Sequence, residues 1–226
     1  MNLLGLDTST AASTACVLRG DGEAFEYEPS PEALTSAPAH AAELMPAVDR
    51  VVADAGLDFG DLDAVAVGVG PGAFTGLRIG VTTARALAHS AGLELRPVSS
   101  LAALAHGIEA ELALPVIDAR RGEVFAALYD GREELWPAEP QDPADLAQRV
   151  AASGLHPLAA GDGSVRFRDV FEAAGTQVAA AGSRAHVVRG LSICRLALDA
   201  PPAVPQAVLP QYLREPDAKP LEDRTP

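Results

Sequence analysis

The feature that most constrains this chain is the glycine-rich run Gly-Pro-Gly-Ala-Phe-Thr-Gly-Leu-Arg-Ile-Gly at residues 70–80. It follows an apolar segment of β-strand character at 64–69 and leads into an alanine-rich helical segment at 77–91. A strand, a glycine-rich turn and a helix N-terminus in this order can place backbone N–H groups around an anion. The run is not a Walker loop, because it lacks the Gly-Lys-[Ser/Thr] ending. It is not the dinucleotide fingerprint either, because no Gly-x-Gly-x-x-Gly follows the first strand.

The charge of the chain limits what it can bind. There are 17 Lys and Arg against 31 Asp and Glu, a formal net charge of −14 at pH 7. Binding to RNA or DNA rests on neutralising phosphates with Lys and Arg, so unaided binding to a polyanion is disfavoured. If tRNA is involved, we expect it to be reached only through another subunit.

Size and composition indicate a globular protein. A length of 226 residues suits one large domain or two small ones, and the apolar fraction of 48% argues against disorder. The N-terminus does not resemble a signal peptide, and no run approaches the ~18 apolar residues of a membrane helix. Cys16 and Cys194 have no metal-type spacing. We therefore expect reduced thiols, a cytoplasmic location and no membrane contact.

The order of elements predicts a mixed sheet with helices packed on it. In the first half we expect strands at 3–7, 14–19, 23–28, 64–69 and 94–98 and helices at 40–55 and 77–91. In the second half we expect strands at 114–118, 123–129, near 158 and at 177–180, and helices at 101–110, 142–152, 170–174 and 183–199. The residues from 200 onward are rich in proline and charge, and we expect them to be extended or disordered beyond Tyr212.

The two helices of the first half differ in their apolar patterns. The 40–55 helix has one stripe close to a 3.6-residue period, interrupted by Pro46, where a kink is expected. The 77–91 helix has one stripe that can cover a sheet and a second, small-residue stripe that includes Gly80, Thr83 and Leu87. The second stripe is explained equally well by a neighbouring chain and by a helix enclosed within its own fold.

A set of motifs, read in order, resembles one known family. They are Leu6-Asp7-Thr8-Ser9-Thr10, His40-x-x-Glu43-Leu44-Met45-Pro46, the 70–80 run, Val98-Ser99-Ser100-Leu101, Asp118-Ala119-Arg120-Arg121-Gly122 and Pro210-x-Tyr212-Leu213-Arg214. Together they resemble the TsaB (YeaZ) family over almost the whole chain. The resemblance implies an α/β fold like that of actin, Hsp70 and the sugar kinases, with two small lobes, each a mixed sheet with packed helices. We place these lobes at 1–98 and 99–213, with a flexible tail at 214–226.

The resemblance also implies a function. Members of this family are partners of a metal-bearing TsaD-type subunit, which transfers a threonylcarbamoyl group to the adenosine 3′ of the anticodon in tRNAs that read codons starting with A. A TsaC-type enzyme supplies threonylcarbamoyl-AMP, and a TsaE-type ATPase joins the complex. We therefore expect a non-catalytic dimerisation subunit, with an ATP-dependent phosphotransferase of the same fold as the alternative.

One group of residues matches the phosphate corner of the kinase-like fold. There an aspartate can hold Mg²⁺ through water while hydroxyl and N–H groups hold phosphate. For an isolated Asp-Thr-Ser-Thr, a purely structural interpretation is favoured, namely a turn with local side-chain hydrogen bonds. A second phosphate loop is also lacking, because Gly161-Asp162-Gly163-Ser164 has the wrong spacing. The residues of this candidate or vestigial phosphate site are Asp7, Thr8, Thr10, Gly70, Gly72, Thr75 and Gly76.

Metal and nucleophile chemistry are disfavoured. The TsaD-like relatives carry an HxxxH pair where this chain has Ser100 and Leu104, and the five histidines include no pair at i,i+3 or i,i+4. We expect no metal. Ser99 directly before a helical run is most simply an N-cap. The turn at 118–122 carries two arginines that could bind an anion, although a tight hairpin with solvated charges is the favoured interpretation.

The predicted work of the chain is therefore to present the 40–55 and 77–91 helices to a TsaD-like partner. No cofactor is expected for this chain alone, with ATP or ADP allowed at the subunit interface, and the same surface is expected to form homodimers without the partner. Leu44→Asp or Leu87→Asp is expected to abolish the complex without unfolding the lobe. The predicted interface residues are His40, Leu44, Val48, Val51, Arg78, Gly80, Thr83 and Leu87.

Overall fold

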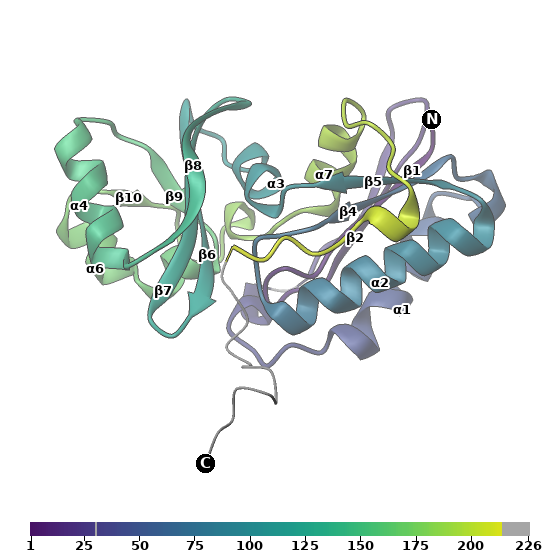
Figure 1. Ribbon diagram of the computed structural model, residues 1–226, viewed down its shortest axis with the longest axis horizontal. Coiled ribbons are helices and arrows are strands. Elements are labelled where there is room, and N and C mark those ends of the chain that lie inside the picture. Colours follow the sequence, from purple (N-terminus) through teal and green to yellow (C-terminus); the bar gives the residue numbers. More distant parts are fainter. Residues whose placement is uncertain (30, 214–226) are drawn as a thin grey trace, which may run out of the picture.

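The computed structural model describes residues 1–29 and 31–213, and these form two lobes side by side (Figure 1). The predicted tail at 214–226 lies outside the described residues. Each lobe is built on one five-stranded mixed sheet. The predicted fold class, two small α/β lobes of the actin-like type, is confirmed.

The first sheet has the order β3-β2-β1-β4-β5. Antiparallel pairing joins β1 to β2 and β2 to β3, whereas β4 runs parallel to β1 and β5 runs parallel to β4. The strands are β1 (Leu3–Asp7), β2 (Thr14–Leu18), β3 (Ala24–Tyr27), β4 (Ala64–Gly68) and β5 (Glu94–Val98).

Helices cover both faces of this sheet (Figure 1). The helices α1 (His40–Asp54) and α2 (Phe74–Ala91) pack on one face, and α7 (Gly190–Ala197) packs on the other against β1 and β2. Every residue of β1, β2 and β4 is buried, as expected for strands enclosed on two sides. A Cβ atom on Gly5 would lie 2.6 Å from Cys194 Sγ, so this glycine permits the close approach of α7.

The second sheet repeats the topology of the first. Its order is β10-β9-β6-β7-β8, with antiparallel β6, β7 and β8 and parallel β6, β9 and β10. One face packs on α3, and a separate apolar cluster on the other face includes α4 and α6. The elements are β6 (Leu112–Arg120), β7 (Glu123–Asp130), β8 (Glu133–Gln141), β9 (Leu158–Ala160), β10 (Gln177–Val178), α3 (Ser100–His106), α4 (Pro143–Ser153), α5 (Asp162–Arg166) and α6 (Arg168–Ala173).

Local signals explain where several helices begin and end. Ser99 Oγ accepts a hydrogen bond from Ala102 N, which confirms the predicted N-cap of α3. Asp142 caps α4 by accepting from Ala144 N at 2.8 Å. Gly92 ends α2 in the left-handed conformation that favours glycine, with φ of 67°.

Three predictions of elements were wrong. The strand β8 and the short helix α5 were missed. The last helix begins at Gly190 rather than at 183, because Ser183 caps a short 3-10 turn at Arg184–His186. Since α7 and the residues after it return to the first sheet, the last part of the chain packs with the first lobe.

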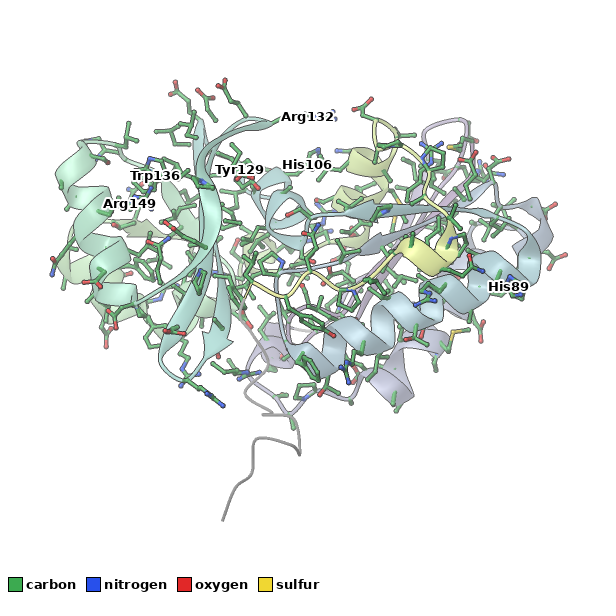
Figure 2. All side chains as sticks on the ribbon, viewed as in Figure 1. His89, His106, Tyr129, Arg132, Trp136 and Arg149 are labelled. Carbon is green, nitrogen blue, oxygen red and sulfur yellow. The ribbon has the colours of Figure 1, made fainter. Side chains whose placement is uncertain are left out.

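Charged contacts join the lobes at two places. Arg189 and Arg184 both bond the half-buried Glu26 of β3. Arg132, in the β7–β8 turn, pairs with Asp199 just after α7, and Figure 2 shows Arg132 at the top of the junction between the lobes.

The short 3-10 turns are η1 (Pro31–Leu34), η2 (Phe59–Asp61), η3 (Arg184–His186) and η4 (Pro205–Ala207).

Candidate functional site

The predicted phosphate corner is built around a buried aspartate. Asp7 is the last residue of β1 and is 1% exposed. Its Oδ1 accepts from Ser9 N at 2.8 Å and from Ser9 Oγ at 2.6 Å, and its Oδ2 accepts from Ser100 Oγ at 2.7 Å. Burial raises the pKa of Asp7, and the hydrogen bonds from Ser9 and Ser100 oppose that rise. Both carboxylate oxygens therefore have partners inside the protein.

The glycine-rich run lies directly against the loop that follows β1. Thr8 Oγ1 donates to Gly76 O at 2.7 Å, and Ala73 N donates to Ser9 O at 2.7 Å. A Cβ atom on Gly76 would lie 2.0 Å from Thr8 O, and one on Gly72 would lie 2.4 Å from Ser9 O. The glycines are thus required for close packing between the β1–β2 loop and the start of α2.

The predicted corner residues are therefore brought together, but the polar groups of Asp7, Thr8 and Gly70 bond other groups of the protein. Asp7, Thr8 and Thr10 are buried, and Gly70 N donates to Ser100 Oγ at 3.2 Å. Thr75 is exposed on the first turn of α2. This geometry matches the interpretation of Asp-Thr-Ser-Thr as a turn with local hydrogen bonds.

Three predicted interface residues lie in the core instead. Leu44, Val48 and Val51 are at most 1% exposed and pack against the first sheet. Their prediction as partner contacts is corrected, because the apolar stripe of α1 faces its own lobe. Leu44→Asp would bury an unpaired charge and is expected to unfold the lobe rather than to abolish docking alone.

The remaining interface residues vary in exposure. His40 is 4% exposed, its Nδ1 lies 2.9 Å from Ser13 Oγ, and burial lowers its pKa. Gly80 is buried against Thr8, while Thr83 and Leu87 are half-buried. Arg78 is exposed. The exposed residues of the two helices include Ala41, Ala42, Met45, Pro46, Asp49, Thr75, Arg78, Thr82 and Ala86.

An aromatic cluster on this surface was not predicted. The rings of Phe74 and Tyr212 are 5.0 Å apart, and they are 44% and 39% exposed. The Arg78 guanidinium lies 3.9 Å from the centre of the Phe74 ring, and its Nε donates to Tyr212 Oη at 3.1 Å. The motifs at 70–80 and 210–214 contain its three residues, but neither motif reveals that they meet.

The final described segment holds Tyr212 in place. The segment runs along α2 (Figure 1), where Ala203 forms a bridge to Leu95 of β5 and Val208 is buried in the core of the first lobe. Gln211 N then donates to Val69 O at 2.7 Å. We call residues 203–213 the strap. Beside the cluster, a groove of about 560 Å³ lies between the starts of α1 and α2 and reaches Arg120 of the second lobe.

Two further predictions concern metal and membrane. Ser100 and Leu104, at the positions of the expected HxxxH pair, are both fully buried. Among the residues the structure describes, no three His, Cys, Asp or Glu side chains are grouped so that they could hold a metal ion. Over the same residues, no helix has the length and apolarity needed to cross a bilayer.

Comparison with known proteins shows which family this chain resembles in sequence and in structure. The family model described as "TsaD: tRNA N6-adenosine threonylcarbamoyltransferase" matches residues 31–220. The TsaB protein of Bacillus subtilis, named as a tRNA threonylcarbamoyladenosine biosynthesis protein, is 31% identical over 99% of this chain and 100% of its own length. An uncharacterized protein of Mycobacterium leprae is 35% identical over 97% of this chain. The matched region is 56% of the length of that relative. The solved structure of YeaZ from Pseudomonas aeruginosa superposes with a TM-score of 0.73 at 28% identity, covering 94% of this chain and 99% of that one.

The fold is that of a two-lobed protein of the actin-like class, and the family model that matches the chain is that of the tRNA N6-adenosine threonylcarbamoyltransferases. Within that group, the chain belongs to the TsaB (YeaZ) family.

Proposed function

We propose that this chain is a non-catalytic subunit that binds a TsaD-type protein and supports threonylcarbamoyl transfer to the adenosine 3′ of the anticodon in tRNA. The family membership and the name of the Bacillus subtilis relative support a role in this pathway. The buried Ser100 and Leu104 support a non-catalytic role, since neither side chain can replace an imidazole ligand.

The observation that carries the proposal is the exposed cluster of Phe74, Arg78 and Tyr212 beside an apolar groove. Aromatic and arginine side chains dominate the binding energy of protein interfaces, and a contiguous exposed apolar patch is typical of an interaction site. Met45 on α1, 37% exposed, adds a flexible apolar contact to the same face. The TsaD-type partner would dock on this face.

Other parts of the proposal follow from charge and symmetry. The net charge of −14 means that tRNA is contacted through the complex, with TsaE-type and TsaC-type proteins as further partners. Without a partner, the same face can pair with a second copy of the chain. The rival function, an ATP-dependent phosphotransferase, would need the Asp7 carboxylate, whose oxygens bond Ser9 and Ser100. We therefore assign no cofactor to this chain alone.

The test is reconstitution of threonylcarbamoyladenosine formation. Purified TsaC-, TsaD- and TsaE-type proteins, tRNA, ATP, threonine and bicarbonate are combined with and without this chain, and the modified nucleoside is measured. Product that depends on the chain supports the proposal. Equal product without it refutes it, and nucleotide turnover by the isolated chain would then test the rival.

Variants locate the docking face. Met45→Asp and Tyr212→Ala are expected to weaken binding of the TsaD-type protein by about tenfold or more without lowering the melting temperature substantially. Leu198→Asp is the matched control, because Leu198 is 50% exposed and lies at the end of α7, away from α1 and α2. A loss of binding in Leu198→Asp but not in the other two would place the interface elsewhere.

A further inference from the structure

A polar cavity of about 260 Å³ lies between the two lobes and shares Arg120 with the groove beside the proposed docking face. Its second-lobe wall consists of Asp118 and Arg120 of β6 and Asp162, Val165 and Arg166 of α5. Residues 34–36, at the end of the 3-10 turn η1 of the first lobe, form the opposite wall. Four ionisable side chains thus meet in one small cavity, and three of them, Asp118, Asp162 and Arg166, do not line the groove of the docking face.

Asp118 holds the two arginines in place. Its carboxylate is 5% exposed, and its Oδ2 accepts from Arg166 Nη1 at 2.8 Å and from Arg120 Nη1 at 3.2 Å. Oδ1 accepts from the backbone N–H of Arg120 at 2.9 Å. Within the described residues, hydrogen bonds engage only Nη1 of each guanidinium, so further N–H donors of both remain for a ligand.

The guanidiniums are open to solvent and come from different elements. The Arg120 and Arg166 side chains are 54% and 47% exposed. The hydroxyls of Thr35 and Ser36 donate to Glu32 O, so the arginines supply the hydrogen-bond donors among the lining side chains. Two guanidiniums approaching from two directions suit a tetrahedral anion with several oxygens. The volume lies just below the range of sites for drug-sized ligands and fits a small group.

We propose that this cavity binds a phosphate group between Arg120 and Arg166, oriented by Asp118. This goes beyond the partner role, because it gives the chain a ligand site of its own at the lobe boundary. A bound phosphate would contact the β6–β7 hairpin and α5 of the second lobe and would face residues 34–36 of the first.

Asp162 makes the site sensitive to pH. Its Oδ1 accepts from Asp118 N at 2.9 Å, and burial raises its pKa to about 6. The charged groups near it are Asp118 and Arg120 from β6 and Arg166 from its own helix, and the nearby His186 accepts from Gly161 N. Protonation of Asp162 removes a negative charge from the cavity, so anion affinity should rise as the pH falls through 6.

The binding test uses the full chain and calorimetric titration with inorganic phosphate or with sulfate, whose charge is constant from pH 5 to 8, at fixed ionic strength. We expect saturable binding that weakens at least tenfold in both Arg120→Gln and Arg166→Gln. Arg149→Gln is the matched control, because Arg149 is also half-exposed and ion-paired, yet lies beside Trp136 on the outer part of the second lobe (Figure 2). Thermal melting confirms that each variant is folded.

Absence of saturable binding, or equal weakening in Arg149→Gln, overturns the proposal. AMP serves to identify the source of the phosphate. Tighter binding of AMP than of inorganic phosphate indicates a nucleotide phosphate, and the reverse indicates free phosphate; both support the site.

For the pH dependence, sulfate should bind severalfold more tightly at pH 5.5 than at pH 7.5. Asp162→Asn, which keeps an acceptor for Asp118 N, should bind with the higher affinity at both pH values. Affinity in the unchanged chain that is constant or falls on acidification overturns the role of Asp162.

Discussion

The two lobes share one topology and carry an aspartate at the same place, but the carboxylates of the two aspartates have different partners. Oδ1 of Asp7 in β1 accepts from the N–H of Ser9, and Oδ1 of Asp118 in β6 accepts from the N–H of Arg120, in each case two residues on. Oδ2 of Asp7 bonds the buried hydroxyl of Ser100. Oδ2 of Asp118 instead bonds two half-exposed guanidiniums beside a cavity.

The cause of the difference lies in the neighbouring segments. In the first lobe, the glycine-rich run lets α2 approach the β1–β2 loop until the corner is filled. In the second lobe, β6 and β7 are joined by a tight turn at Arg121 and Gly122, both with positive φ, and the short α5 packs against β6. The same fold can therefore give one closed corner and one open one, and the glycines of the 70–80 run permit the closure of the first.

The largest effect should come from reopening the closed corner. In Gly76→Ala, the new Cβ would lie 2.0 Å from Thr8 O, so the β1–β2 loop or α2 must move. We expect a loss of about 3 kcal/mol in the free energy of unfolding, measured by urea denaturation. Gly60→Ala is the control, because nothing lies within 4 Å of its added Cβ, and it should be neutral or slightly stabilising. Equal stability of the two variants would show that the corner is loosely packed.

A second prediction concerns pH and the open corner. The rise of the Asp162 pKa from 3.8 to about 6 means that the folded state binds the proton more tightly than the unfolded state. The associated stability is fully present below pH 3.8 and is lost as the pH rises through 6, a change of roughly 2–3 kcal/mol. Asp162→Asn should therefore gain stability relative to the unchanged chain between pH 4 and pH 8. A constant difference across this range would contradict the raised pKa.

The sequence predicted the strand, glycine run and helix that form the closed corner, but not that the corner is filled by the protein itself. The strand at 64–69, the glycine run and the helix after it were found because apolar runs and glycine turns are local signals. Whether a glycine faces a ligand or a neighbouring loop depends on Thr8 and Ser9, which are distant in sequence. The stripe of α1 was likewise found, but periodicity shows only that a face is buried and not what covers it.

Elements with weak local signals were missed. The strand β8 contains Pro137, Pro140 and three glutamates, a composition typical of a loop. It forms because it is an edge strand, where proline is tolerated. Tyr212 reaches Phe74 only because the strap runs along α2 to its first turn, a contact between residues far apart in the chain.

A third prediction compares the two aspartates directly. Asp7→Ala leaves the buried donors of Ser9 and Ser100 without partners, and relief of the carboxylate's burial offsets only part of that cost, so we expect a loss of about 2 kcal/mol. Asp118→Ala frees two guanidiniums that water can reach, so the loss should be about 1 kcal/mol. Urea denaturation of both variants measures the difference. A larger loss for Asp118→Ala would reverse the assignment of closed and open corners.

The smallest expected effects come from the groups that bond each Oδ2. Ser100→Ala removes a fully buried hydroxyl that donates to Asp7 and accepts from Gly70 N, so about 1 kcal/mol should be lost. Arg166→Gln breaks an ion pair whose arginine is 47% exposed, and less than about 0.5 kcal/mol should change. High salt should reduce the small Arg166 effect further and leave the Ser100 effect unchanged, because only the exposed pair is screened. If the Ser100 effect also falls with salt, water and ions reach Asp7, and the first corner is as open as the second.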